Sequence, residues 1–256
     1  MSPKPALDPS GKPAADHEYM VPGDGVELRP LYLNGRWAVR GVPIEVVDPA
    51  TGATIGRVST VDRPRVAQAL EDAQRAWPAW RKLPARDRGA YLHKIADGLE
   101  SRRDELARTI TLENGKPLAQ SRGEVAMSVD HLRWFAAEAG RAYGRVVPNQ
   151  AAGKRHLVLR SPVGVVGAIS PWNFPLVLAM RKVAPALAAG CPVILKPASA
   201  TPLCAVMFAE AVEQAGLPPG VFQLVAGRAA EIAAELLENP ICRKITFTGS
   251  TEVGRR

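Results

Sequence analysis

The stretch that decides the fold is residues 163–196, VGVVGAISPWNFPLVLAMRKVAPALAAGCPVILK. Its two apolar runs, at 163–170 and 193–195, are typical of strands buried on both faces. Residues 176–189 between them have the length and apolar spacing of a helix. The alternation continues with a helix at 201–215, a strand at 222–225, a helix at 229–237 and a strand at 244–247. This order predicts an α/β fold with a doubly wound, mainly parallel sheet.

The residues before this stretch combine short strands with helices. Asn34-Gly35 lies between apolar residues and predicts a hairpin turn. Asp62 has the position of a helix cap, and Ser101 with Asp104 resembles a capping box that opens a further helix. We expect a strand at 44–47, a helix beginning near Asp62, and helices at 86–99, 101–114 and 118–142.

Two other segments differ in composition from the rest. Residues 1–30 are rich in proline and charge and lack the apolar core of a signal peptide, so we expect a flexible leader. Residues 145–161 hold two apolar segments around a Gly-containing turn, which predicts a β-ribbon. The expected division is therefore a leader at 1–30, a helical part at 31–144, the ribbon at 145–161 and strand–helix units at 162–256.

Composition excludes several classes of protein. The chain has 256 residues, 46% of them hydrophobic and 23% charged, which is typical of a globular protein. Its net charge of +8 is spread along the chain, so a nucleic-acid partner is not expected. No apolar stretch is long enough to span a bilayer. Three cysteines without CxxC spacing argue against a disulfide framework or a metal site and favour a reducing, cytoplasmic location.

The candidate functional residues lie where strands end and helices begin, the place where doubly wound sheets bind ligands. The first such junction presents Trp172 and Asn173 between two prolines. The Asn173 carboxamide has two N–H donors, which suit a carbonyl oxygen that develops negative charge. An asparagine that only caps the following helix is the alternative.

Two further junctions carry weaker signals. Lys196 leaves a buried strand and is followed by Pro197, Ala198 and Ser199, which would suit a phosphate or a ribose. Gly249 allows a close backbone approach, and Ser250 lies at a helix N-terminus, where an anion such as pyrophosphate is favoured. A lysine that reaches solvent and an ordinary helix cap are the alternatives.

Taken together, the motifs are far more specific. PWN at 171–173, KPAS at 196–199 and FTGST at 247–251, in this order, resemble the NAD(P)-dependent aldehyde dehydrogenase family, whose fold is Rossmann-like. The resemblance covers residues 33–256. Within the family the chain is most similar to succinate-semialdehyde dehydrogenases, and aromatic-aldehyde dehydrogenases share part of the segment around Arg181. Other matching segments are NGRW at 34–37, DPATG at 48–52, NGKP at 114–117 and GLPPGVF at 216–222.

The resemblance implies a mechanism in which a cysteine thiolate attacks the aldehyde, hydride passes to the nicotinamide, and a glutamate activates the water that releases the acid. Asn173 would be the oxyanion donor, and Arg181 would reach a substrate carboxylate or the cofactor unless it is simply a solvated helix arginine. The ribbon resembles the family's oligomerisation ribbon, which implies a homo-oligomer. The residues that would bind the cofactor are Trp172, Asn173, Lys196, Pro197, Ala198, Ser199, Gly249 and Ser250.

The nucleophilic cysteine and the glutamate base of the family follow the Gly-Ser-Thr motif, and no residue here matches either one. Cys191, Cys204 and Cys242 stand outside the nucleophile's context, and Glu252 suits a helix cap better than a base. We therefore expect an amino-terminal half, truncated before the catalytic domain and inactive alone. A cofactor-binding or partner-binding remnant is the alternative function.

Ser199 also bears on the choice of cofactor. NAD-preferring members of the family often have glutamate at this position, where its carboxylate binds the adenosine hydroxyls. A serine removes the charge that would repel a 2′-phosphate, and Lys196 is close along the chain. We predict a preference for NADP⁺, with NAD⁺ tolerated.

Overall fold

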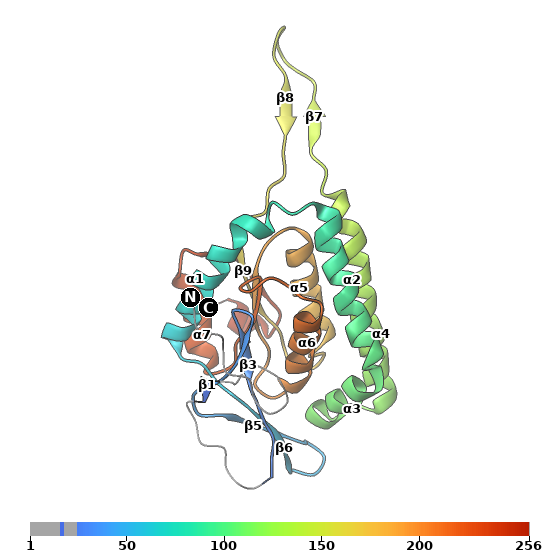
Figure 1. The fold of residues 1–256 in the computed structure, drawn as a ribbon, viewed down its shortest axis with the longest axis vertical. Helices are drawn as coiled ribbons and strands as arrows, with labels where there is room; N and C mark the ends of the chain where they lie inside the picture. The colour runs from blue at the N-terminus through green and yellow to red at the C-terminus, as the bar shows by residue number, and fades with distance from the viewer. Residues whose placement is uncertain (1–15, 18–24, 256) are drawn as a thin grey trace, which may run out of the picture.

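The computed structural model describes residues 16–17 and 25–255, and Figure 1 shows their arrangement. Its central sheet consists of β9 (Val165–Ile169), β10 (Val193–Lys196), β11 (Phe222–Leu224) and β12 (Cys242–Phe247). The spatial order is β11-β10-β9-β12, and every neighbouring pair is parallel. This confirms the predicted α/β fold with a parallel sheet.

Helices cover both faces of this sheet, which explains why β10 is buried along its whole length. On one face lie α1 (Arg63–Trp80) and α7 (Ala229–Glu238). On the other lie α5 (Val177–Ala188) and α6 (Leu203–Gln214). Outside α5 and α6 pack the remaining long helices, α2 (Ala85–Ser101), α3 (Arg103–Asn114) and α4 (Leu118–Glu138), followed by the 3₁₀ turn η1 (Ala139–Arg141).

The chain before α1 forms short strands. β3 (Leu31–Leu33) and β4 (Arg36–Val39) make the expected hairpin, because Asn34 and Gly35 have positive φ values of 49° and 76° that suit a two-residue turn. Two further strands, β5 (Ile44–Val47) and β6 (Thr54–Val58), pair antiparallel, and β6 was not predicted. Asp62 caps α1 as expected, its carboxylate accepting from Arg65 N at 3.0 Å.

The predicted capping box is wrong. Ser101 ends α2, where its hydroxyl donates to the Gly98 carbonyl at 2.9 Å. The next helix begins at Arg103, and no side chain caps it. A hydroxyl can satisfy a carbonyl of the last turn as readily as an N–H of the next helix, so two adjoining helices make this motif ambiguous.

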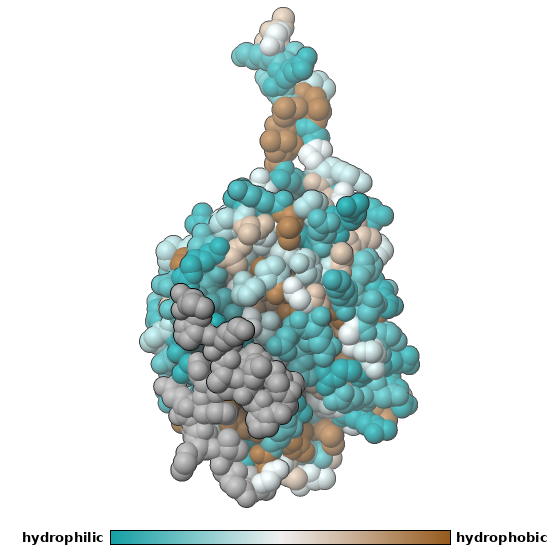
Figure 2. Space-filling view, viewed as in Figure 1, coloured by the Kyte–Doolittle hydropathy of each residue, from teal (hydrophilic) through white to brown (hydrophobic). Residues whose placement is uncertain are grey.

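A ribbon of β7 (Arg145–Val147) and β8 (His156–Val158) projects from the body of the molecule. Its apolar side chains are exposed, with Val146 75%, Leu157 63% and Leu159 81% accessible. Figure 2 shows these hydrophobic residues along the projecting ribbon.

Most of the leader expected at 1–30 lies outside the described residues. Where it is described, it forms strands: β1 (Asp16–His17) pairs with β4, and β2 (Leu28–Arg29) pairs with β6. Hydrogen bonds to the adjoining strands thus order parts of a segment whose composition predicts flexibility. In the described part of the chain, no helix is both long and apolar enough to cross a membrane.

Candidate cofactor and oxyanion site

The strand order defines where a ligand would bind. From β9 the chain proceeds to β10 and β11 on one side, whereas β12 pairs with the other edge of β9. The topological switch point therefore lies between β9 and β12, and the crevice outside their carboxyl ends is the expected ligand site. The loop at 170–176 follows β9, and the loop at 248–250 follows β12.

The loop after β9 is held through its backbone carbonyls. The Trp172 carbonyl accepts from Asn114 Nδ2 at 2.8 Å, and the Asn173 carbonyl accepts from Lys116 Nζ at 2.7 Å. The side chains of the loop stay accessible: Trp172 is 60% exposed, and the Asn173 carboxamide makes no hydrogen bond to the described residues. Both N–H donors of Asn173 are thus available to a ligand.

A buried glutamate fixes the start of α5. One carboxylate oxygen of Glu124 accepts from the backbone N–H groups of Leu176 and Val177 at 2.9 and 3.2 Å. Its other oxygen accepts from Lys116 Nζ at 2.7 Å. The side chains of Glu124 and Lys116 are 0% and 9% exposed, so this ion pair is removed from solvent.

The loop after β10 contains a buried cation. Lys196 is 6% exposed, and its ammonium donates to the Pro197 carbonyl at 3.0 Å. No carboxylate among the described residues pairs with it, and burial lowers its pKa. The next helix, α6, is capped by Glu113, whose two oxygens accept from Leu203 N at 2.7 Å and Cys204 N at 3.0 Å.

Ser199 lines a large open pocket, together with residues from α1, α7 and the segments before α1. Three arginines, Arg40, Arg65 and Arg228, line it with Ser199. Its two acids are engaged: Asp62 caps α1, and Glu231 pairs with Arg228 at 3.0 Å. Three arginines and two acids thus line this pocket.

In the loop after β12, Gly249 and Ser250 both make contacts with residues close to them in the sequence. A Cβ at Gly249 would come too close to the tip of the Phe247 ring, so a larger residue there would require the ring to move. Ser250 caps α8 (Thr251–Gly254), its hydroxyl accepting from Val253 N at 3.3 Å. Neither observation tests a role in binding pyrophosphate.

Two cations of α5 border the crevice. Arg181 is exposed, and its Nε donates to His131 Nε2 at 3.2 Å. Lys182 is 5% exposed and donates to Thr248 Oγ1 at 2.6 Å, so it joins α5 to the end of β12. Burial, and then the charge of Arg181, lowers the pKa of Lys182.

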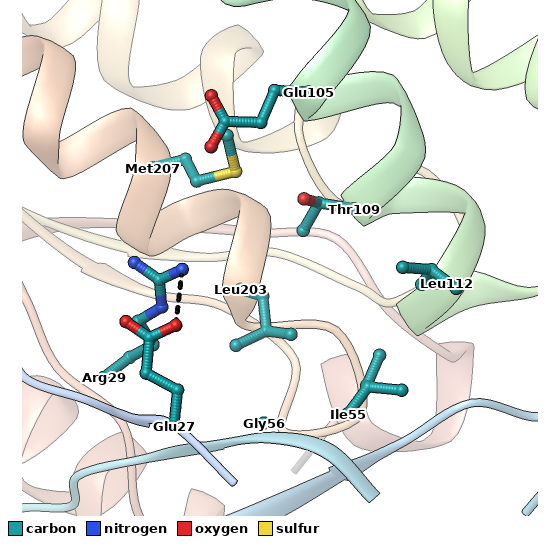
Figure 3. A pocket seen from close by; sticks show the side chains of 9 residues that line it. All are labelled: Glu27, Arg29, Ile55, Gly56, Glu105, Thr109, Leu112, Leu203 and Met207. Carbon is teal, nitrogen blue, oxygen red and sulfur yellow. Dashed lines mark ion pairs between the residues drawn. The ribbon is translucent and has the colours of Figure 1, made fainter. Parts of the chain in front are cut away.

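A separate cavity of about 120 Å³ lies between α3, α6 and β6. Figure 3 shows Leu203 and Met207 of α6 facing Thr109 and Leu112 of α3, with the Arg29–Glu27 ion pair at 3.0 Å. Pockets for drug-sized ligands measure roughly 300–1,000 Å³. This cavity is too small for a dinucleotide.

The comparisons with known proteins agree with this geometry. The model of the "Aldehyde dehydrogenase family" matches residues 38–256, which include every loop described above. The chain belongs to the aldehyde dehydrogenase family. A glutarate-semialdehyde dehydrogenase of Pseudomonas aeruginosa is 48% identical over 227 residues, 88% of this chain and 47% of that protein. A succinate-semialdehyde dehydrogenase [NADP(+)] of Escherichia coli is 45% identical over 226 residues, covering 88% and 47%.

Solved structures of aldehyde dehydrogenases and related enzymes share the fold. An "E. coli NADP dependent enzyme" superposes with a TM-score of 0.87 at 44% identity, over 89% of this chain and 48% of that one. Lactaldehyde dehydrogenase from Escherichia coli gives 0.88 at 37% identity, over 90% and 49%. This aldehyde dehydrogenase chain therefore spans about half the length of the relatives it matches.

Two of the three cysteines of the chain are buried. Cys191 and Cys204 are 3% and 0% exposed. Burial is the main cause that raises the pKa of the Cys204 thiol well above its usual value, and burial also raises that of Cys242. A nucleophilic cysteine needs an accessible thiolate, so the structure favours structural roles for Cys204 and Cys242.

The sequence analysis missed the residues that support the site. Asn114 and Lys116 were noted only as part of a family motif, and Glu113 and Glu124 were not noted at all. A signal for Glu124 does exist in the sequence: it lies on the same helical stripe as Val125, Val129 and Leu132, all buried. An acid on an apolar stripe predicts a buried partner.

Proposed function

We propose that the protein oxidises an aldehyde to a carboxylic acid with NADP⁺ as hydride acceptor. This chain would contribute the cofactor site and the oxyanion donor. The observation that carries the proposal is the meeting of three loops at one end of the sheet, each with a polar residue at the carboxyl end of its strand. These loops begin after β9, β10 and β12.

Asn173 is the proposed oxyanion donor. Its side chain is exposed at the switch point, it donates to none of the described residues, and its backbone is fixed from behind by Lys116. A fixed amide donor that needs no reorganisation is what stabilises negative charge on a reacting carbonyl oxygen. Trp172, Gly249 and Ser250 would lie along the cofactor in the same crevice.

The cofactor proposal rests on Lys196 and the pocket around Ser199. Lys196 is buried without a carboxylate partner, so a ribose hydroxyl or a phosphate oxygen would supply an acceptor that the protein leaves out. Arg65 and Arg228 border the same pocket as Ser199 and would favour the charge of a 2′-phosphate. Pro197 and Ala198 would shape the loop against the ribose. NAD⁺ would bind more weakly, because it lacks the 2′-phosphate. It would still be tolerated, because nothing in this loop excludes its bare hydroxyl.

The proposed substrate is an aldehyde with a carboxylate at its far end, with succinic semialdehyde as the first choice. Arg181 is the exposed cation of α5, and its guanidinium is oriented by His131, while its terminal nitrogens have no hydrogen-bond partner among the described residues. The two relatives named above act on four- and five-carbon semialdehydes by name, which supports this class of substrate.

We further propose that the ribbon pairs with a second copy of the chain, as the resemblance to the family's oligomerisation ribbon implies. Its exposed apolar residues give a partner something to cover. A cytoplasmic location stays a prediction.

Titration calorimetry on the 256-residue chain tests the cofactor proposal. We expect saturable binding of NADP⁺ that is about tenfold or more tighter than that of NAD⁺. Lys196→Met should weaken both cofactors, whereas Lys94→Met on the outer helix α2 should weaken neither. Failure of the chain to bind either cofactor would contradict the proposal. Because Cys191 and Cys204 are buried, we expect the chain alone to give no turnover of succinic semialdehyde.

A further inference from the structure

The backbone carbonyls of the loop at 171–175 accept hydrogen bonds mainly from groups outside the loop. Pro171 and Pro175 have no N–H group, so the tight turn between them has few internal donors for its carbonyls. The Trp172 carbonyl instead accepts from Asn114, the last residue of α3, at 2.8 Å and more weakly from Thr201 Oγ1 at 3.5 Å, and the Asn173 carbonyl accepts from Lys116, just after α3, at 2.7 Å. The backbone of this loop is therefore fixed by residues more than fifty positions earlier in the chain.

Lys116 is the centre of this arrangement. Its ammonium donates to the Asn173 carbonyl and to Glu124, each at 2.7 Å, and lies 4.0 Å from the centre of the Phe174 ring. Because the side chain is only 9% exposed, water does not compete strongly for these contacts. A charged donor makes a stronger hydrogen bond to a carbonyl than a neutral one does, roughly twofold.

Glu124 links this contact to the helix that follows. Its second oxygen accepts from the backbone N–H groups of Leu176 and Val177, the beginning of α5. One carboxylate thus neutralises Lys116 and also fixes the first turn of α5. The Asn173 carbonyl, through Lys116, and the start of α5 are thus both held by one carboxylate of α4.

We propose that Asn114, Lys116 and Glu124 form a clamp that positions the Asn173 carboxamide, with Lys116 as its principal positioning residue. The clamp touches only the backbone of the loop and the Phe174 ring, so it leaves the carboxamide free to meet a ligand. This inference rests on the oxyanion role proposed for Asn173. An oxyanion donor must lie within about 2.7–3.1 Å of the developing charge, so a loosened backbone would misplace it.

The alternative is that the clamp only stabilises the fold, and Glu113 provides the matched control. Glu113 is also a buried glutamate that accepts from two backbone N–H groups at a helix start, but its partners belong to α6. A Glu113→Gln variant should therefore lose stability without loosening the loop at 171–175. A Lys116→Met variant keeps the alkyl stem and removes only the donor.

Nuclear magnetic resonance on the 256-residue chain can separate these roles. We would measure ¹⁵N heteronuclear NOEs for the backbone of residues 172–174, the Trp172 indole N–H and the Asn173 side-chain NH₂, with Trp172→Phe to assign the indole. The expected result is a marked fall in the loop NOEs of Lys116→Met and a smaller fall in Asn114→Ala, with values for Glu113→Gln like those of the wild type. Asn114 is partly accessible, so Asn114→Ala provides a second test of the clamp if Lys116→Met does not fold.

Unchanged loop NOEs in Lys116→Met, or equal loosening in Glu113→Gln, would overturn the clamp. This readout does not depend on aldehyde oxidation, so it stands even if the proposed function fails. In a polypeptide that contains this chain and turns over aldehyde, Lys116→Met should lower kcat by about tenfold or more, with NADP⁺ affinity unchanged. A fall in NADP⁺ affinity with kcat unchanged would assign Lys116 to cofactor binding instead.

Discussion

Two neighbouring junctions of the same sheet are built alike but charged differently. After β9, Glu124 holds the start of α5, and after β10, Glu113 holds the start of α6. Each glutamate is almost fully buried, and each replaces the N-terminal cap that the helix lacks in its own sequence. Glu124 has Lys116 as a counter-ion, whereas no cation among the described residues pairs with Glu113.

The difference appears in the pKa of Glu113, which burial raises to about 7, with the hydrogen bonds from Cys204 and Leu203 opposing the shift. The junction after β9 carries a neutralised charge and supports the loop where we place the chemistry. The junction after β10 supports the loop where we place cofactor recognition. One fold thus caps two helices with the same residue type, once with a buried counter-ion and once without one among the described residues.

The largest expected effect belongs to the junction after β9. In a polypeptide that contains this chain and turns over aldehyde, Asn173→Ala should lower kcat by about two to three orders of magnitude, the usual loss for one oxyanion donor. The affinity for NADP⁺ should change little, because the carboxamide and not the backbone is removed. Steady-state kinetics and calorimetry measure the two quantities. An unchanged kcat with weaker cofactor binding would instead show that Asn173 binds the cofactor, and it would contradict the separate roles proposed for the two junctions.

The next effect concerns the pH dependence that Glu113 gives to the junction after β10. Folding raises the pKa of Glu113 from 4.5 to about 7, so the folded protein binds this proton more tightly than the unfolded chain does. The stability that results is fully present below about pH 4.5 and is lost as the pH rises to about 7. A shift of this size corresponds to about 3 kcal/mol.

Urea unfolding at several pH values checks this, with Glu113→Gln as the control. The free energy of unfolding of the wild type, taken relative to the variant, should fall by about 3 kcal/mol between pH 4.5 and pH 7 and then level off. Cys204 contacts Glu113 but has its own pKa raised well above neutral, so it does not titrate in this window. Parallel profiles for the two proteins would show that burial does not raise the pKa of Glu113.

The sequence predicted the sheet well because β9, β10 and β11 are almost entirely buried. Runs such as that of β10 contain Val, Ile and Leu and end at a lysine, and such runs are read without tertiary information. The candidate residues could be located for the same reason, because each loop begins where a predicted strand ends. Gly227, in contrast, carries no distinctive motif, and the structure places it with Ser199 in the lining of one pocket.

The supporting residues could not be predicted in the same way. Glu113 caps a helix that begins 90 residues later, and Glu124 contacts Leu176, 52 residues later. Only the packing of α3 and α4 beside α5 and α6 brings these pairs together, and no local pattern encodes it. The failed capping box at Ser101 has the opposite cause: its local pattern was satisfied by a competing carbonyl within its own helix.

Ser199→Glu sharpens the assignment of the junction after β10 to cofactor recognition. A carboxylate there would repel a 2′-phosphate and accept from the bare ribose hydroxyls of NAD⁺. Losing one charge-assisted bond and adding repulsion corresponds to roughly 1.5–3 kcal/mol, or about ten- to a hundredfold in the ratio of affinities. Titration of wild type and variant with both cofactors measures this ratio. Tighter NAD⁺ binding by the wild type, or no shift in the variant, would place the discriminating contacts elsewhere.

The smallest effect tests whether α5 serves the substrate rather than the cofactor. Arg181 extends from α5 toward solvent, oriented by His131, and an exposed cation contributes less than a buried one because water screens it. Arg181→Gln should therefore raise KM for succinic semialdehyde by about tenfold, equivalent to about 1.4 kcal/mol, and leave KM for an uncharged aldehyde of the same length nearly unchanged. Arg133→Gln, on the outer side of α4 and paired with Asp97 at 3.1 Å, is the matched control and should change neither value. Because Arg181 and Asn173 belong to the same junction, a substrate-specific effect of Arg181→Gln would extend the chemistry of that junction to recognition of the far carboxylate. Weaker NADP⁺ binding by the same variant would instead show that α5 also contacts the cofactor. Substrate and cofactor would then not be recognised at separate junctions.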